Sequence, residues 1–420
     1  MTAYTILTIL ICLSAAFAYI NHRFIRLPFV IGLFLLSTVL SLLVLSARVW
    51  LPLPYEQLRN FVEQTDISRA ILDVMLGLLL FAGALHTSWA AMRGQLAPVA
   101  LLAIGGVLVS TAVIGGLLYG LTMLLGLQVP LVYCLLFGAV ISPTDPIAVI
   151  GILTQVGVPK KIETLIVAES LFNDGVGVVT FISLLGVAHT GSFDIGHFSM
   201  LFVQEAVGGV IFGLVLGIIL HYLMASIDSY DTEVLLTLAF VLAGYSAANA
   251  LHISGALAMV VMGILVGNYK QDEVMSDISH EYVQKFWTVI DAVLNAILFI
   301  LVAMVLVVIE FRAIYALIGV VAVVIVLLSR ALVVYLPRWL LPSIAYYNKK
   351  EARVIVWGGL RGGLSMAMAL SLPESESRHM ILIATYFCVL FSIVVQGLTI
   401  GRVAKTICSI PADMAKKDLA

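Results

Sequence analysis

The chain contains 420 residues, of which 62% are hydrophobic and only 11% are charged, and its mean hydropathy is +1.13. Soluble domains contain about 25% charged residues, so this composition excludes a soluble globular protein. The formal net charge of −2 indicates no particular class of partner, and no nucleic-acid partner is expected. We expect an all-α integral membrane protein, because helices satisfy their own backbone hydrogen bonds inside a bilayer.

Apolar stretches recur along the whole chain. A membrane-spanning helix needs about 20 apolar residues, and about thirteen stretches meet this requirement. They cover 3–21, 27–47, 70–92, 97–125, 129–156, 164–189, 199–226, 233–251, 253–269, 284–310, 313–336, 352–372 and 379–407. No Lys or Arg occurs in residues 1–21, so we expect a retained first helix and not a secretory signal. The longest loop, 48–69, has space for only a short amphipathic segment.

The loop charges predict an orientation. Lys and Arg concentrate in cytoplasmic loops. If the N-terminus lies outside, 15 basic residues fall on the cytoplasmic side and 5 on the outer side. This bias supports thirteen spans with the N-terminus out and the C-terminus in. No soluble domain is expected, so residues 1–420 form one polytopic membrane domain.

The fifth span is interrupted by two prolines, Pro143 and Pro146. Each proline removes a helical hydrogen bond and clashes with the preceding turn, so the helix should unwind at its middle. Non-helical backbone at membrane depth survives only where protein or a cavity supports it. Carbonyl groups near Thr144 could then bind a cation, and Asp145 would offset the positive N-terminal end of a half-helix. The alternative is a simple proline kink with a solvating Asp145.

The twelfth span has a second weak point, Gly358-Gly359-Leu360-Arg361-Gly362-Gly363. The guanidinium of Arg361 could offset the negative C-terminal ends of half-helices. Paired interruptions in corresponding halves predict inverted repeats, two crossing interrupted helices and a transport site near the bilayer midplane. Alternatively, the glycines only permit tight helix packing.

The sixth span carries ionisable groups inside an apolar stretch, which by default marks a substrate, ion or proton pathway. Residues four apart share a helix face, so Ser170 and Asp174 form one stripe, and Glu169 and Asn173 the neighbouring one. Arg330, buried in the eleventh span, is the expected structural partner of Glu169. Asp174 then remains unpaired, and a single carboxylate that binds either H⁺ or a metal cation produces exchange. The alternative places both acids in one structural network.

Two other functional classes compete with exchange. An intramembrane serine hydrolase would need a nucleophile in a tight glycine-flanked turn, but no Gly-x-Ser-x-Gly element occurs. A cation channel would line a pore symmetrically, whereas paired broken helices favour a carrier. The four cysteines show no metal spacing and no disulfide framework. We expect neither enzymatic activity nor a cofactor, with Na⁺ and H⁺ as transported substrates.

Several segments, in this order, resemble the cation:proton antiporter-1 family, the NhaP-type sodium/proton exchangers, over roughly 70–400. The matching segments are Ile141–Val149, Glu169–Val179, Ile253–Ala256, Gly263–Asn268 and Trp357–Ser365. The resemblance implies a homodimer in the cell membrane, in which a core domain moves like an elevator against a dimerisation domain. We expect the core in about 70–190 and 284–407, without parts of 313–350. The dimerisation bundle would then come from the N-terminal and middle helices.

The resemblance also implies roles for individual residues. Asp174 is the acid that binds Na⁺ and H⁺, Ser170 and the Thr144 backbone are further Na⁺ ligands, and Glu169 with Arg330 forms a structural ion pair. Relatives with Asn at the position of Asn173 are electroneutral, which implies exchange of one cation for one proton. Na⁺ is the expected cation, with Li⁺ or K⁺ as alternatives.

One departure from the family concerns the third span. Some relatives place a further carboxylate near the site there, whereas this chain offers only His86, with Asp73 more than two turns earlier. Asp291 and Asn295 share a face of the tenth span. For this pair, a structural role at the helix entrance is favoured over a contact with the ion path.

Overall fold

The computed structural model describes residues 3–47, 52–190, 195–268, 277–309 and 312–405. Throughout these ranges the regular structure is helical, apart from one isolated β-bridge. Ten helical stretches within them are long and apolar enough to cross a membrane, and α9 and α14 are shorter apolar helices. The chain is therefore an all-α integral membrane protein, as its composition predicts. Some basic residues that support the orientation, Arg48, Lys270, Lys416 and Lys417, lie outside the described residues.

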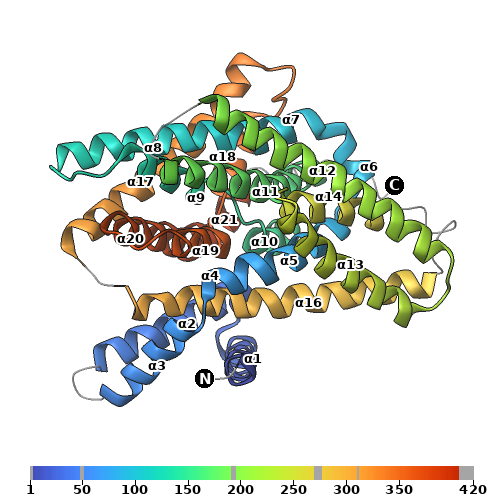
Figure 1. Ribbon diagram of the computed structural model, residues 1–420, viewed down its shortest axis with the longest axis horizontal. Coiled ribbons are helices and arrows are strands. Elements are labelled where there is room, and N and C mark those ends of the chain that lie inside the picture. The colour runs from blue at the N-terminus through green and yellow to red at the C-terminus, as the bar shows by residue number, and fades with distance from the viewer. Residues whose placement is uncertain (1–2, 48–51, 191–194, 269–276, 310–311, 406–420) are drawn as a thin grey trace.

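The helices follow the chain in the order of the predicted spans (Figure 1). The first half contains α1 Ala3–Ile20, α2 Phe29–Ala47, α3 Pro52–Gln64, α4 Ile67–Arg69, α5 Leu76–Leu85, α6 Trp89–Met92, α7 Leu96–Ala100, α8 Gly106–Leu124, α9 Leu131–Ile141, α10 Ile147–Val156 and α11 Lys160–Thr190. The second half contains α12 Ile195–Ala225, α13 Tyr230–Ala250, α14 Gly255–Gly267, α16 Asp277–Met304, α17 Ala313–Leu340, α18 Lys349–Trp357, α19 Gly363–Leu370, α20 Glu376–Phe391 and α21 Gly397–Lys405. The expected amphipathic segment of the 48–69 loop is α3.

Both predicted interruptions are present. The first separates α9 from α10 at 142–146, and the second separates α18 from α19 at 358–362. At the first interruption, the two prolines have no backbone N–H group to donate to a helical hydrogen bond. The eighth and ninth spans are also separate helices, because the chain turns through His252, whose φ of 54° lies in the left-handed region, before Ser254 caps α14.

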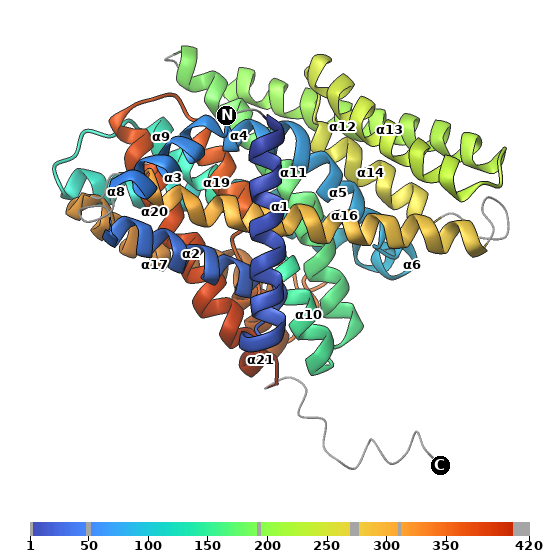
Figure 2. The ribbon, with the colours of Figure 1, turned by 90° about the horizontal axis from the view of Figure 1, so that it is seen from below.

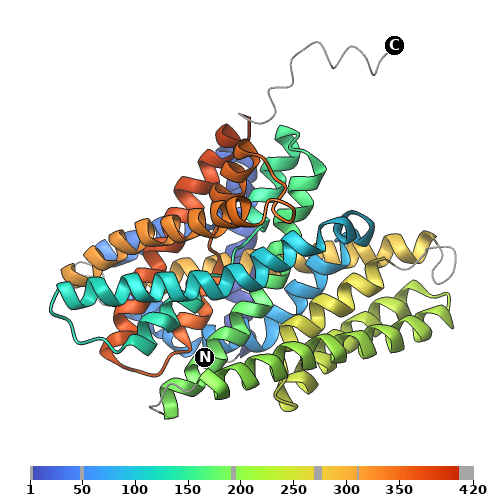
Figure 3. The ribbon, with the colours of Figure 1, turned by 90° about the horizontal axis from the view of Figure 1, so that it is seen from above.

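The helices pack in two groups. In one, α8 packs against α9 and α17, α17 against α20, and α19 against α9 and α20. In the other, α14 packs against α5 and α12, and α16 against α2, α5 and α13. Figure 2 shows α1 crossing α16, and Figure 3 shows α12 beside α13 and α8 beside α17, in agreement with these contacts. Helix α11 contacts both groups, so the side chains of the sixth span lie where the groups meet.

Candidate functional site

The two interrupted helices cross at their unwound segments. The Asp145 amide donates a hydrogen bond to the Leu360 carbonyl at 2.8 Å, and the two residues form an antiparallel β-bridge. Each unwound segment thus satisfies part of the backbone of the other. This exchange is what allows non-helical backbone to persist in an apolar environment.

The positive charge of Arg361 offsets the negative end of the helix dipole of α9, in the fifth span. Its side chain is 2% exposed, and its Nη1 donates to the carbonyl oxygens of Ser142 and of Pro143, the latter at 2.8 Å. These carbonyls follow the last residue of α9, where the helix dipole is negative. The guanidinium therefore lies at the helix end that a cation stabilises.

Asp145 lies at two helix N-termini. Its Oδ1 accepts a hydrogen bond from the Ile147 amide, the first residue of α10, at 2.9 Å. Its carboxylate also packs against Gly362, which caps α19, so closely that a Cβ at Gly362 would overlap it. An anion is stabilised at both places by the positive ends of the helices.

Thr144 is held by α11. Asn173 uses both ends of its amide: Oδ1 accepts from the Thr144 amide at 3.2 Å, and Nδ2 donates to Thr144 Oγ1 at 2.8 Å. The hydroxyl groups of Ser170 and Thr144 are 3.0 Å apart. All three residues are buried. The polar side chains of α11 thus fix the unwound segment of the fifth span in position.

Glu169 and Arg330 form a buried ion pair with two hydrogen bonds, one of them between Arg330 Nη2 and Glu169 Oε2 at 2.8 Å. Nη2 also donates to the Ile355 carbonyl at 3.2 Å. The pair connects α11, α17 and α18. A Cβ at Gly359 would run into the Arg330 guanidinium, so this glycine of the twelfth span makes space for the pair.

A cavity of about 450 Å³ adjoins the crossing and is lined by residues of both helix groups. Thr144 and Asp145 line it from the segment between α9 and α10, and Asp174 lines it from α11. Ser170 and Asn173 are not among its lining residues, because their polar atoms are directed at Thr144. Asp174 has no salt bridge among the described residues. Two carboxylates of α11, Glu163 in its first turn and Asp174 deep inside the helix, therefore line the cavity without a basic partner among the described residues.

Sequence reasoning misjudged the opposite wall of this cavity. Asp291 and Asn295 lie inside α16 and not at its entrance, and both line the cavity. His86 lines it as well, with Nδ1 at 2.7 Å from the Ala82 carbonyl and Nε2 at 3.0 Å from Thr288 Oγ1. Asp73 is instead exposed, 3.8 Å from Arg69. The available signal for Asp291 was its position well inside an apolar stretch.

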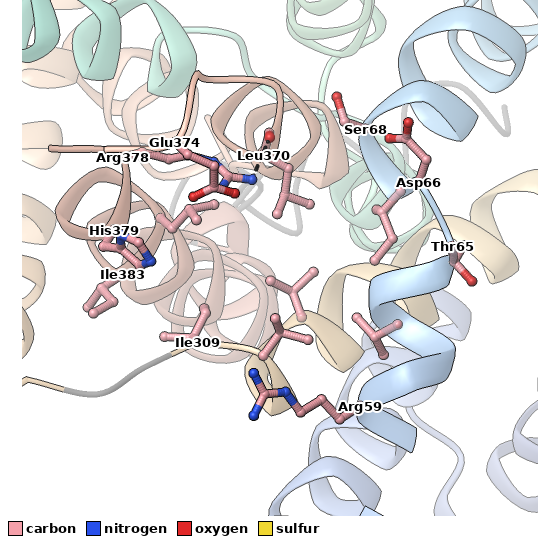
Figure 4. A pocket seen from close by; sticks show the side chains of 15 residues that line it. Arg59, Thr65, Asp66, Ser68, Ile309, Leu370, Glu374, Arg378, His379 and Ile383 are labelled. Atoms are coloured by element: carbon pink, nitrogen blue, oxygen red, sulfur yellow. Dashed lines mark hydrogen bonds and ion pairs between the residues drawn. The ribbon is translucent and has the colours of Figure 1, made fainter. Parts of the chain in front are cut away.

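A second cavity, of about 550 Å³, lies between α3–α4 and α19–α20 (Figure 4). Arg59 and Asp66 line it on one side, and Arg378 and His379 on the other. Arg378 pairs with Glu374 and donates to the Leu370 carbonyl at 3.0 Å. This cavity is also lined by elements of both helix groups.

Three elements line both cavities, so the cavities follow one another along the contact between the helix groups. From α4 to α5, Ile67 lines the second cavity and Ile71 the first. Along α19, Leu370 lines the second cavity and Ser365 the first. The third element is α16 with the turn after it: Leu298 lines the first cavity and Val305 the second. About one to two helical turns, at 1.5 Å per residue, separate the cavities on each element.

Comparisons with known proteins identify the family of this chain. A family model described as "Sodium/hydrogen exchanger, transmembrane" matches residues 12–406. The chain is 45% identical over 408 residues to the Na⁺/H⁺ antiporter NhaP of Pseudomonas aeruginosa, covering 94% of this chain and 95% of that protein. It is 35% identical to the Na⁺/H⁺ antiporter NhaH of Halobacillus dabanensis, covering 83% and 86% of the two chains.

The fold is shared with a solved structure. The sodium proton antiporter MjNhaP1 of Methanocaldococcus jannaschii, solved at pH 8, superposes with a TM-score of 0.74, at 18% identity, over 96% of this chain and 98% of that one. The family match extends through the two interrupted helices, the buried ion pair and Asp174. This chain belongs to the sodium/hydrogen exchanger family of transmembrane proteins.

Proposed function

We propose that the chain exchanges Na⁺ for H⁺ across the cell membrane and that Asp174 is the group the two ions share. The observation that carries this proposal is the position of Asp174. It lines a cavity between the two helix groups, next to the unwound segment of the fifth span, and it lacks a basic partner among the described residues. The relatives named as Na⁺/H⁺ antiporters support Na⁺ as the cation.

The chemistry follows from one half-buried carboxylate inside a membrane-spanning helix. A bare carboxylate in an apolar environment is unfavourable, so it binds either a proton or a cation. A bound Na⁺ favours the ionised form and a bound proton excludes Na⁺, which makes the two ions competitors. One charge then crosses in each direction, so exchange is electroneutral. The amide of Asn173, which adds no second titratable group beside Asp174, supports this stoichiometry.

Thr144 and Ser170 complete the Na⁺ site in this proposal. The Thr144 backbone carbonyl, freed from the helix by the interruption, offers a hard oxygen ligand, which suits a cation such as Na⁺. Ser170 Oγ is 3.0 Å from Thr144 Oγ1, close enough for both to approach one ion. Asn173 positions Thr144, while Asp145 and Arg361 compensate the half-helix dipoles. Glu169 and Arg330 hold α11 and α17 together.

Helix packing supports alternating access. The first cavity and the second cavity follow one another along the contact between the two groups, so a shift of one group against the other could open one cavity to Asp174 and close the other. The packing favours a moving group of α6–α11 and α17–α21 and a stationary group of α1–α5, α12–α14 and α16. In this division α5 and α16 belong to the stationary group, whereas the sequence suggests that both belong to the core.

We propose thirteen crossings, with the N-terminus outside and the C-terminus inside. The ten long apolar stretches, the broken pairs α9–α10 and α18–α19, and the short helix α14 together make this number. In this orientation the first cavity is nearer the cytoplasm, because it is lined by Thr87 and Glu163, which lie close in sequence to the basic residues Arg93 and Lys160. A homodimer through the stationary group fits the same scheme.

Transport by the purified protein in proteoliposomes tests the proposal. An imposed pH gradient should collapse on addition of Na⁺ with wild-type protein and persist with Asp174→Asn, while the variant keeps its wild-type melting temperature in detergent. Clamping the membrane potential should leave the rate unchanged. Testing Li⁺ and K⁺ in the same vesicles distinguishes a sodium exchanger from a potassium exchanger. Full activity of Asp174→Asn would refute the assignment of Asp174.

A further inference from the structure

The wall of the first cavity opposite Asp174 carries a second set of oxygen atoms. Asp291 and Asn295, one turn apart on α16, line this cavity. They also line a neighbouring cavity of about 440 Å³, which reaches Arg26 and Gln155. Ile147 and Gly151 are common to both cavities as well. Asp291 and Asn295 therefore lie where two spaces adjoin, on a route that leads to Asp174.

The Asn295 side chain contains an oxygen atom without a partner. Asn295 is 1% exposed, and its Nδ2 donates to the Asp291 backbone carbonyl at 2.9 Å and to Asp291 Oδ1 at 3.0 Å. Both of these atoms only accept hydrogen bonds, so the NH₂ group must face them, and the orientation of the amide is fixed. Among the described residues, Asn295 Oδ1 is left without a hydrogen-bond partner.

A buried oxygen with no partner costs free energy of about 1–3 kcal/mol and calls for an explanation. A cation in the cavity supplies one, because an amide oxygen and a carboxylate oxygen are hard ligands for alkali ions. Asp291 supplies the charge. Its Oδ1 receives the Asn295 amide, and the carboxylate has no salt bridge among the described residues.

His86, the basic side chain that lines the first cavity, does not neutralise this acid through a direct bond. Both ring nitrogens of His86 are engaged elsewhere, Nδ1 with the Ala82 carbonyl and Nε2 with Thr288 Oγ1. His86 and Asp291 line the same cavity, but no hydrogen bond or ion pair joins them among the described residues. Asp145 lines this cavity as well. Two acids that share one cavity attract a cation into the space between them.

We propose that Asp291 and Asn295 form a second, weaker cation subsite, which holds an alkali ion before it reaches Asp174. The inference rests on the proposed role of Asp174 as the exchanging acid. The subsite belongs to α16, which packs against α1, α2, α5 and α13, whereas Asp174 belongs to α11. The ion therefore transfers from the stationary wall to the moving one, and the subsite raises the local Na⁺ concentration without entering the exchange stoichiometry.

Transport kinetics and direct binding test the subsite together. Asp291→Asn should raise the apparent KM for Na⁺ about tenfold, the change expected for about 1.4 kcal/mol of lost binding, and leave the maximal exchange rate within about twofold of wild type. Asp291→Glu should restore most of the affinity. Asp73→Asn removes an exposed acid on the same stationary group, outside the cavity, and should behave as wild type.

Sodium NMR line broadening of the purified protein gives the second measurement. Asp174→Asn should still broaden the Na⁺ signal, and the double variant Asp174→Asn/Asp291→Asn should not. The subsite is refuted if Asp291→Asn keeps the wild-type KM, if it lowers the maximal rate with KM unchanged, or if Asp174→Asn alone removes all broadening. Full exchange by Asp174→Asn would instead refute the proposed function, so the two failures are distinguishable.

Discussion

Asp145 lies against the start of α19, in the broken span that contains Arg361. Arg361 in turn lies at the end of α9, in the broken span that contains Asp145. Arg361 donates to the Ser142 and Pro143 carbonyls after α9, and Asp145 packs against Gly362 at the start of α19. The two charges compensate the dipoles of three half-helices, α9, α10 and α19, and no salt bridge joins them to each other. The crossing is therefore held by charge–dipole and backbone interactions, which depend on the geometry of both spans at once.

Loss of the Arg361 guanidinium should destabilise the crossing. Arg361→Met leaves the Ser142 and Pro143 carbonyls unpaired, at a cost of about 1.5–3 kcal/mol for each charged hydrogen bond. Arg361→Lys should recover only part of this, because an ammonium lacks the planar fork of a guanidinium. Melting of the detergent-solubilised protein, followed by size-exclusion chromatography, measures the effect. Equal melting temperatures for wild type and Arg361→Met would contradict it.

The Glu169–Arg330 ion pair should show a large coupling energy. Each single variant, Glu169→Leu or Arg330→Met, leaves one uncompensated buried charge and should lose about 3–5 kcal/mol. The double variant should be more stable than either single variant, because no buried charge remains. The thermal stabilities of the four proteins form a double-mutant cycle. Strictly additive losses would show that the two residues act independently.

Gly362→Ala should abolish transport through steric overlap. The added Cβ would meet the Asp145 carboxylate and displace it from the start of α19. Gly116→Ala in α8 is the matched control, because no atom lies within 4 Å of the Cβ it would add. Sodium-driven pH-gradient collapse in proteoliposomes should be lost in the first variant and normal in the second. Normal exchange by Gly362→Ala would show that transport tolerates displacement of the Asp145 carboxylate from the start of α19.

Asn173→Ala should weaken Na⁺ binding without removing exchange. The substitution deletes two hydrogen bonds that hold Thr144, each worth about 0.5–1.5 kcal/mol, but it leaves Asp174 in place. We expect an apparent KM for Na⁺ about fivefold to tenfold higher and an unchanged insensitivity to the membrane potential. A variant with no exchange at all would instead make Asn173 a direct ligand.

Local features of the sequence predict much of this structure. The spans follow from apolar length, because a bilayer accepts little else. The interruptions follow from Pro143, Pro146 and the glycines around Arg361, because these residues cannot continue a regular helix cheaply. The sequence also predicts the pairing of Glu169 with Arg330, because a buried charge requires an opposite one. In each case the free-energy cost that one residue, or one pair of residues, imposes on the alternative structure determines which structure forms.

Only the tertiary structure decided which polar side chains face the ion path. Ser170 and Asp174 are four residues apart on α11, yet only Asp174 lines the cavity, because the Ser170 hydroxyl is directed at Thr144. Asp291, which sequence reasoning placed at a helix entrance, lines the same cavity from α16. Helical periodicity defines the faces of each helix, but the rotation of that helix against its neighbours depends on packing across the whole bundle.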